Sequence, residues 1–371
     1  MSKRKEFRAI VTGGGTAGHI NPALSIAKRL IESGGEILYV GSGAPGSMDE
    51  RIVTQSGLRF YGLDLTTPSL KFSFVTIKAV LKILAAVWHC RKIVRKEKPD
   101  FVIGTGGYVS MAMCLAAWTC GVPTFIEEQN IHPGITNRFL ARFVKKIFLT
   151  FEESIKFFPA GARHKCIVTG LPLLHQPERI PMEIFEERNR SRFRILVFGG
   201  SNGAAYLNSS IAEILPQLAQ LEGLELLLST GVKNFDRWVE SNDLSKHPQF
   251  EAVPYINDMT DKLEQASLVI CRAGSSTVFE IVAAAVPAIV IPSPNVAGDH
   301  QRPNAEYLAS TGGALLFDEN KLPSYKLLEI IADLYHNKEK LSDMKRALTR
   351  LQAPKALDVI ERELSTWIGS S

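Results

Sequence analysis

The stretch that decides the fold is R-A-I-V-T-G-G-G-T-A-G-H-I-N-P-A at residues 8–23. A second stretch of the same kind, R-I-L-V-F-G-G-S-N-G-A-A-Y-L-N, stands at residues 194–208. Each begins with a short apolar run, continues through a glycine-rich turn and ends in a helical pattern. This order is typical of the first unit of a nucleotide-binding α/β domain, where glycines let backbone amides and a helix N-terminus approach an anion. Two such units half a chain apart predict two similar domains facing one cleft.

Length and composition agree with two globular domains. A chain of 371 residues is long for one domain, and 45% hydrophobic with 22% charged residues is typical of a soluble protein with an ample core. The five cysteines are odd in number and contain no C-x-x-C pair, which favours reduced thiols over disulfides or a zinc site. No secretory signal is expected at the charged residues 1–7, and the apolar stretch 109–122 is too short to span a membrane.

Strand and helix patterns alternate steadily, which predicts an α/β protein with parallel sheets. In the first half we expect strands at residues 8–12, 36–41, 101–104, 124–127, 146–150 and 166–169. In the second half we expect strands at residues 194–198, 224–229, 250–253, 268–271 and 288–291.

The same patterns set the expected domain boundaries. The polar, proline-bearing stretch 171–192 is predicted to be a linker between a first domain, residues 1–170, and a second domain, residues 193–353. Residues 354–371 carry apolar side chains at helical spacing, and we expect this helix to pack back on the first domain.

The first glycine loop, Gly13–Gly18, satisfies the G-x-G-x-x-G pattern of dinucleotide-binding domains. That pattern also needs an acidic residue at the end of the second strand to hold a ribose. Here the strand 36–40 ends in Gly41 and Ser42. We therefore expect no nicotinamide or flavin cofactor at this loop.

The second half carries the better candidate nucleotide site. Arg272 to Thr277 follow a strand and precede a helix, so their amides and hydroxyls are expected to meet phosphate oxygens, as is the loop Gly199–Gly203. Glu280, about one turn into the same helix, is a candidate acceptor for a ribose diol, or alternatively an ordinary first-turn acid. The loop 299–304 concentrates groups that bind hydroxyls, although a polar surface loop would read the same. No D-x-D motif occurs, so we expect no metal to bridge the phosphates.

These motifs together resemble the MurG family of glycosyltransferases. The resemblance rests on G-G-G-T-A-G-H-I-N-P at 13–22, G-T-G-G-Y-V-S at 104–110, E-Q-N at 128–130, G-G-S-N-G-A at 199–204, C-R-A-G at 271–274 and D-H-Q at 299–301. It implies a GT-B fold, in which two Rossmann-like parallel-sheet domains face a cleft. It also implies inverting transfer of N-acetylglucosamine from UDP-N-acetylglucosamine to the 4-hydroxyl of N-acetylmuramoyl-pentapeptide on undecaprenyl diphosphate, which converts lipid I to lipid II in peptidoglycan synthesis. UDP-N-acetylglucosamine would be a substrate, with no cofactor or essential metal.

The resemblance assigns roles residue by residue. The catalytic base would be His19 or Glu128; His19 could also only orient the acceptor diphosphate. Acceptor binding is assigned to Gly14, Thr16, Gly18, Tyr108, Asn130 and Asn137. Donor binding is assigned to Ser201, Gly203, Ile256, Arg272, Ser275, Glu280, His300, Gln301 and Asn304.

Two positions depart from the family pattern. Glu127 stands where the family has histidine, and Leu174 stands where the family has an arginine at the crossing between domains. These departures concern how acceptor and phosphate charges are neutralised.

The segment 74–98 has a basic, amphipathic helical pattern, with Ile77, Leu81, Leu84 and Trp88 on one stripe. Such a helix can lie on an anionic membrane surface, although a crossover helix packed on the sheet gives the same pattern. We expect mainly a crossover helix packed on the sheet, with the end 72–88 partly facing the membrane. The protein would then be peripheral on the cytoplasmic face of the plasma (inner) membrane.

The expected partners are UDP-N-acetylglucosamine, a lipid-linked acceptor, an anionic membrane surface and other cell-wall synthesis proteins, but no nucleic acid. The alternatives are another GT-B enzyme of UDP-sugars, such as a lipid glycosyltransferase or a UDP-N-acetylglucosamine 2-epimerase, a nicotinamide oxidoreductase, or a non-catalytic nucleotide-binding scaffold.

Overall fold

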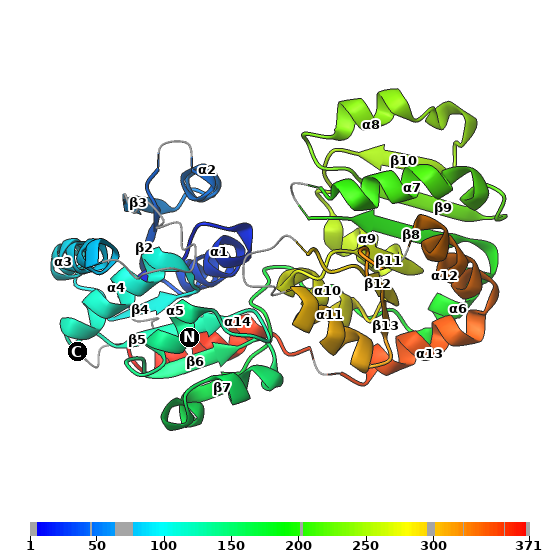
Figure 1. Cartoon of the computed structure of the whole chain (residues 1–371). Helices are drawn as coiled ribbons and strands as arrows, with labels where there is room; N and C mark the ends of the chain where they lie inside the picture. The colour runs from blue at the N-terminus through cyan, green and yellow to red at the C-terminus, as the bar shows by residue number, and fades with distance from the viewer. Residues whose placement is uncertain are drawn as a thin grey trace. The chain divides into compact units, whose positions relative to one another are not determined.

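The computed structural model describes residues 6–44, 47–63, 77–200, 203–294, 301–321, 323–351 and 353–368, with the side chains of residues 77–82 left out. The chain divides into two compact units (Figure 1). Unit 1 comprises residues 1–174 and 354–371, and unit 2 comprises residues 175–353.

The described part of unit 1 contains a sheet of seven parallel strands in the order β3-β2-β1-β4-β5-β6-β7. The strands are β1 Phe7–Thr12, β2 Gly35–Ser42, β3 Arg59–Leu63, β4 Phe101–Gly104, β5 Thr124–Glu128, β6 Lys146–Leu149 and β7 Cys166–Val168. The connecting helices are α1 Ala17–Glu32, α2 Met48–Gln55, α3 Ile77–Glu97, α4 Gly107–Thr119 and α5 Ile135–Leu140. Two 3₁₀ turns, Glu152–Phe157 and Ala160–Lys165, join β6 to β7.

Successive side chains of β1 face opposite sides of this sheet and so belong to different cores. Ile10 packs in the cluster that contains α3 and α4, whereas Ala9 and Val11 pack in the cluster that contains α1 and the C-terminal helix α14, Ala356–Ser365. Arg29 of α1 fastens α14 through ion pairs to Asp358 and Glu361, each at 2.6 Å. The sheet is therefore covered on both faces, as its apolar parallel strands require.

The described part of unit 2 contains a sheet of six parallel strands in the order β10-β9-β8-β11-β12-β13. These are β8 Phe193–Phe198, β9 Leu224–Ser229, β10 Phe250–Val253, β11 Leu268–Cys271, β12 Ala288–Val290 and β13 Ala314–Leu316. The helices are α6 Met182–Ser191, α7 Ala205–Leu218, α8 Phe235–Ser241, α9 Met259–Gln265, α10 Ser275–Ala284, α11 Gln301–Ser310, α12 Ser324–His336 and α13 Lys338–Thr349, with a 3₁₀ turn at Leu244–Lys246. Ile195 and Leu226 face the core that α7 and α12 cover.

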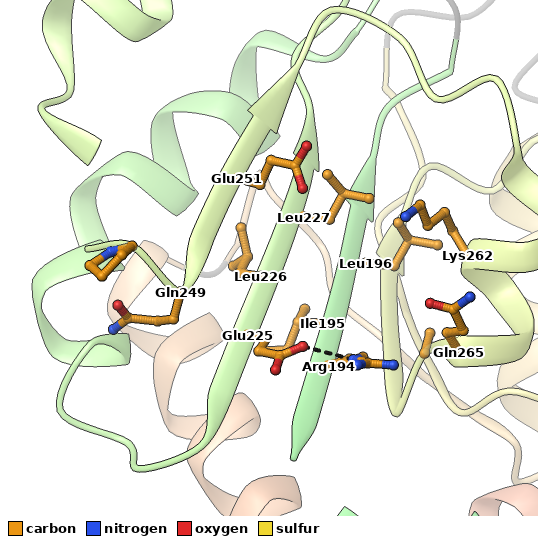
Figure 2. Close-up of a pocket in the computed structure, with 12 residues that line it drawn as sticks. Arg194, Ile195, Leu196, Glu225, Leu226, Leu227, Gln249, Glu251, Lys262 and Gln265 are labelled. Atoms are coloured by element: carbon orange, nitrogen blue, oxygen red, sulfur yellow. Dashed lines mark hydrogen bonds and ion pairs between the residues drawn. The ribbon is translucent and has the colours of Figure 1, made fainter. Parts of the chain in front are cut away.

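The opposite face of β8, β9 and β10 borders a cavity of about 380 Å³. Figure 2 shows Lys262 and Gln265 of α9 beside Leu196, and Arg194 paired with Glu225 at 2.7 Å. The cavity lies along the amino-terminal half of these strands. Ligands of open parallel sheets bind at the carboxyl ends instead, so this cavity is not the candidate site.

The structure differs from the sequence expectations at three elements. Residues 182–191, inside the expected linker 171–192, form α6, and Phe185 is buried in the core of unit 2. The edge strand β3 was not expected because its side chains are mostly exposed and carry no apolar alternation. The three-residue β13 is too short to give a pattern. Within the described residues, we find no helix that combines the length and apolarity needed to cross a bilayer.

Candidate functional site

In unit 1 the candidate residues follow the carboxyl ends of β1, β4 and β5, three neighbouring strands of the sheet. The loops after these strands are joined by hydrogen bonds. Thr105 donates through Oγ1 to the carbonyl of His19 at 2.7 Å, and Gln129 donates through Nε2 to the carbonyl of Thr105 at 2.8 Å. The topology thus brings the three motifs into one site.

Two side chains, those of Tyr39 and Asp49, hold the glycine loop after β1 in place. Tyr39 donates its hydroxyl to the carbonyl of Gly13 at 3.0 Å. The carboxylate of Asp49 accepts from the amides of Gly15, at 3.1 Å, and of Ser42, at 2.8 Å. Asp49 is 1% exposed. A buried carboxylate is stabilised by such amide donors, so the loop and the acid fix each other.

His19 lies in the first turn of α1 and is half-buried. Its Nδ1 lies 3.2 Å from the carbonyl oxygen of Gly14 and 3.2 Å from Oγ1 of Thr16. A Cβ on Gly106 would lie 2.8 Å from the Nε2 of His19, and Gly106 has a φ of +118°. Glycine is therefore required at position 106 to let the ring lie against the second loop.

Glu128 stabilises the loop that follows β5 through hydrogen bonds to other residues of the same loop. Its carboxylate accepts from the backbone amides of Asn130 and Gly134, each at 3.0 Å, and from the side chains of Asn130, at 3.2 Å, and Asn137, at 2.9 Å. Burial raises its pKa, and these donors oppose that rise. Both carboxylate oxygens are thus engaged in holding residues 128–137.

Glu127, at the position that departs from the family pattern, is fully buried. It accepts hydrogen bonds from Nε2 of Gln129 and, at 3.5 Å, from Oγ1 of Thr150. Burial, and then the charge of Glu128, raise the pKa of this carboxyl well above its ordinary value. Glu127 is therefore part of the buried support of the loop.

The remaining acceptor candidates lie on these same loops. Tyr108 is half-buried in the first turn of α4 beside Gly107, at which a Cβ would lie 2.7 Å from the carbonyl of Gly14. Gly18 lies in the first turn of α1. The structure therefore brings together, on connected loops, the residues Gly14, Thr16, Gly18, Tyr108, Asn130 and Asn137.

In unit 2 the candidates again follow strand ends. Arg272 follows β11 and donates through Nη1 to Glu319 at 2.6 Å and to the carbonyl of Ile291 at 3.1 Å. The side chains of this ion pair are 12% and 10% exposed. The guanidinium that we expected to meet phosphate thus has protein partners in this structure.

Glu280 of α10 is half-buried, and no hydrogen bond from a described residue reaches its carboxylate. Burial raises its pKa to about 7. A half-buried carboxylate that accepts no hydrogen bond from the described residues is suited to accept hydrogen bonds from a ligand diol.

Two further residues assigned to UDP-sugar binding, Gln301 and Asn304, have hydrogen-bond partners within unit 2. Gln301 accepts through Oε1 from the amide of Ser293 at 2.8 Å, and the buried Asn304 donates to the carbonyl of Ala273 at 3.2 Å, so both brace the loops around α10.

The remaining residues assigned to UDP-sugar binding are Gly203, Ser275, Ile256, Ser201 and His300. Gly203, with a φ of +71°, packs so closely on the residue after β9 that a Cβ would lie 1.9 Å from the carbonyl of Thr230. Ser275 begins α10, and Ile256 follows β10 with a buried side chain. Ser201 and His300, with Asp299, lie outside the described residues.

Two residues of the site were missed from the sequence, Asp49 and Glu319. Neither lies in a motif; each is brought to its partner by the fold. Within the described residues no group of three or more His, Cys, Asp and Glu side chains is placed to hold a metal ion.

Comparisons with known proteins place these loops in a family. The model of the glycosyltransferase family 28 N-terminal domain matches residues 9–149, and that of the family 28 C-terminal domain matches residues 194–360. A protein of Halothermothrix orenii, "UDP-N-acetylglucosamine--N-acetylmuramyl-(pentapeptide) pyrophosphoryl-undecaprenol N-acetylglucosamine transferase", is 36% identical over 365 residues, covering 95% of this chain and 97% of the relative. A protein of Lactococcus lactis with the same description is 36% identical over 94% of this chain and 96% of its own.

Solved structures agree with this placement. The crystal structure of Acinetobacter baumannii MurG matches with a TM-score of 0.76 and 28% identity, over 98% of this chain and 99% of that one. UDP-GlcNAc 2-epimerase from Neisseria meningitidis matches with a TM-score of 0.65 at 13% identity, over 97% of this chain and 100% of that one, which shows a shared fold alone. Two parallel-sheet α/β units, the family 28 matches and relatives described as this transferase over nearly the whole chain lead to one conclusion: the chain belongs to glycosyltransferase family 28, in the MurG family, with the GT-B fold.

Proposed function

We propose that this protein transfers N-acetylglucosamine, with inversion, from UDP-N-acetylglucosamine to the 4-hydroxyl of N-acetylmuramoyl-pentapeptide on undecaprenyl diphosphate. The observation that carries the proposal is the match, over nearly the full length of both chains, to relatives described as this transferase. The epimerase alternative is supported only by shared fold at low identity.

Direct displacement needs a base beside the attacking hydroxyl. The carbonyl of Gly14 can only accept a hydrogen bond, so we propose that neutral His19 carries its proton on Nδ1, 3.2 Å from that oxygen, and that Nε2 takes the proton of the acceptor hydroxyl. An unperturbed histidine has a pKa of about 6.5, close to working pH. Both carboxylate oxygens of Glu128 accept hydrogen bonds from donors of its own loop, which suits this residue to a role in holding the loop. We therefore propose His19 as the base and Glu128 as a residue that positions the acceptor loop.

On the donor side, Glu280 would accept hydrogen bonds from the ribose diol, and the first turn of α10, beginning at Ser275, would bind the diphosphate through its amides. Arg272 would supply positive charge beside this turn as UDP leaves. The backbone of Ile256 would contact uracil, and Gln301 and Asn304 would shape the sugar pocket. In this proposal no step needs a metal ion.

We further propose that unit 1 lies on an anionic membrane at the cytoplasmic face, where its lipid-linked acceptor resides. Leu84 and Trp88 of α3 are 58% and 61% exposed, and the ammonium of Lys92 lies 3.6 Å from the Trp88 ring centroid. Trp118 of α4, 48% exposed, lies against Phe143, with the two ring centroids 4.7 Å apart. Exposed aromatic and aliphatic side chains beside basic ones are suited to an interfacial surface.

The direct test supplies labelled UDP-N-acetylglucosamine with a lipid I analogue and looks for the disaccharide lipid. Appearance of that product at a rate that depends on both substrates is the expected result. Release of free N-acetylmannosamine would instead identify an epimerase. Binding of the donor without any turnover would identify a nucleotide-binding scaffold.

A further inference from the structure

Asp49 and His19 bind opposite ends of one peptide group. The amide nitrogen of Gly15 donates to Oδ1 of Asp49 at 3.1 Å, and the carbonyl oxygen of Gly14 lies 3.2 Å from Nδ1 of His19. These two atoms belong to the same planar, conjugated unit. The buried carboxylate and the imidazole are thus joined in a line of two hydrogen bonds through the Gly14–Gly15 peptide.

A negative charge at the N–H end of a peptide polarises its carbonyl. Hydrogen bonds in such a chain strengthen one another when the local dielectric constant is low. Asp49 is 1% exposed, so water screens its charge weakly. A more negative carbonyl holds the Nδ1 proton of His19 more firmly and makes the imidazolium form more favourable.

The carboxylate of Asp49 is tightly packed against two glycines. A Cβ on Gly14 would lie 2.0 Å from Oδ2 of Asp49, and one on Gly41 would lie 3.0 Å from it. Oδ2 also accepts from the amide of Ser42 at 2.8 Å, which fixes the carboxylate to the end of β2. Glycine at positions 14 and 41 therefore leaves the space that the carboxylate of Asp49 fills, and rotation of this side chain would break its hydrogen bonds to Gly15 and Ser42.

We infer that Asp49 is a positioning residue for the catalytic base: it sets the tautomer of His19 and raises its basicity through the Gly14–Gly15 peptide. This inference rests on the proposed function only where it calls His19 the base. The arrangement does for His19 what a directly bonded carboxylate does in an Asp–His pair, with one peptide group inserted between them.

Other titratable groups lie on the elements packed around this loop. Tyr39 of β2 donates to the carbonyl of Gly13, and Tyr108 lies in the first turn of α4. Glu127 and Glu128 end β5 and are engaged within their own loop. The test must therefore change the charge at position 49 and leave these four groups in place.

The kinetic test compares Asp49→Asn with Glu50→Gln, which removes a charge from the adjacent, exposed position of the same helix. We expect D49N to lower kcat about 10- to 100-fold, by analogy with other outer-shell ligands, with the donor KM nearly unchanged. The acidic limb of the kcat/KM–pH profile should move down by about 0.5 to 1 unit. E50Q should match the wild type. A profile in D49N that coincides with that of E50Q would overturn the inference.

A double-mutant cycle separates action through His19 from a general loosening of the fold. In a His19→Ala background, D49N should lower the residual rate less than twofold, because the group through which Asp49 acts is gone. The same loss of rate in both backgrounds would assign Asp49 a purely structural role.

A third readout needs neither activity nor, for the tautomer, a substitution at position 49. Nitrogen-15 NMR of histidine-labelled wild-type protein, with the His19 signal assigned from H19A, should show neutral His19 protonated on Nδ1. Protonation on Nε2 would refute the inference directly. The same measurement on D49N should show a lower pKa of His19 than in the wild type, and an equal pKa would overturn the inference. If the wild type forms no disaccharide lipid, the proposed function fails while this comparison still decides the link between Asp49 and His19.

Discussion

Arg272 and Glu319 form an ion pair at 2.6 Å that ties together the carboxyl ends of three neighbouring strands in unit 2. Arg272 follows β11, its second acceptor Ile291 follows β12, and Glu319 follows β13. The pair holds the guanidinium in one orientation next to the first turn of α10. It also places a negative charge beside the group that would attract the diphosphate.

Glu319→Gln should tighten donor binding, because the full charge of Arg272 then becomes available to phosphate. We expect the Kd of UDP-N-acetylglucosamine to fall about 3- to 10-fold by calorimetry, with a steeper dependence on salt. Asp318→Asn is the matched control, since Asp318 pairs with Arg302 and Lys321 instead. Unchanged or weaker binding in E319Q would show that the orientation of Arg272 matters more than its charge.

Glu280 should make donor binding depend on pH. With its pKa raised to about 7, the carboxyl is mostly protonated below neutrality and ionised above it, and only the ionised form accepts both hydrogen bonds of a diol. Affinity for UDP-N-acetylglucosamine should therefore rise roughly tenfold from about pH 6 to about pH 8. Glu280→Gln should weaken donor binding and abolish this dependence, while the acceptor KM stays the same. A pH dependence that persists in E280Q would remove Glu280 from the ribose site.

His19→Ala and Glu128→Gln should fail in different ways. H19A should lose about 100- to 10,000-fold in turnover, the range for general bases, with the donor KM kept. E128Q weakens the hydrogen bonds that hold residues 128–137, so its loss should come with a raised acceptor KM and a lower Tm. If E128Q instead abolishes turnover at unchanged Tm and acceptor KM, Glu128 is the base.

Lys345 of α13 should make the stability of unit 2 depend on pH. Its buried ammonium donates to the carbonyl of Ala285 at 3.2 Å, and burial, followed by the charges of Arg188 and Arg179, lowers its pKa to about 8. In the unfolded chain the lysine pKa is about 10.4. Between these values the unfolded chain binds more protons, so the free energy of unfolding rises with pH.

Lys345→Met provides the comparison for this effect. Urea unfolding of both proteins at about pH 7.5, 8.5 and 9.5 should show the wild type gaining stability relative to K345M as pH rises. Groups common to both proteins cancel in this difference. A difference independent of pH would show that Lys345 keeps an ordinary pKa in the folded protein.

The exposed end of α3 should govern vesicle binding. Trp88→Ser combined with Lys92→Glu removes an apolar anchor and reverses a charge, so we expect at least about a tenfold loss of affinity for anionic vesicles in a sedimentation assay. Tyr325→Ser, at a comparably exposed aromatic residue of unit 2, should bind like the wild type. Retained binding in the double variant would contradict the proposed membrane surface.

Local sequence patterns predicted most of the sheet residues. The ranges 101–104, 224–229, 250–253 and 268–271 are strands at those bounds, because apolar runs between turn residues fit buried parallel strands. The sequence patterns did not predict the edge strand β3, because its side chains are mostly exposed and show no apolar periodicity. Helix α6 lies within the stretch 171–192, for which the polar composition predicts a linker. Phe185 nevertheless anchors this helix in the core of unit 2.

By itself, the sequence determined the two-domain α/β architecture and the motif residues that follow strand ends, because local periodicity and glycine spacing encode both. Only the tertiary structure decided what those residues touch. It brought Asp49 to Gly15 across 34 positions of the chain and Glu319 to Arg272 across 47. A carboxylate in a helix that follows a strand looks like any surface acid in sequence. It becomes a functional group when the fold buries it against donors whose positions depend on the whole sheet.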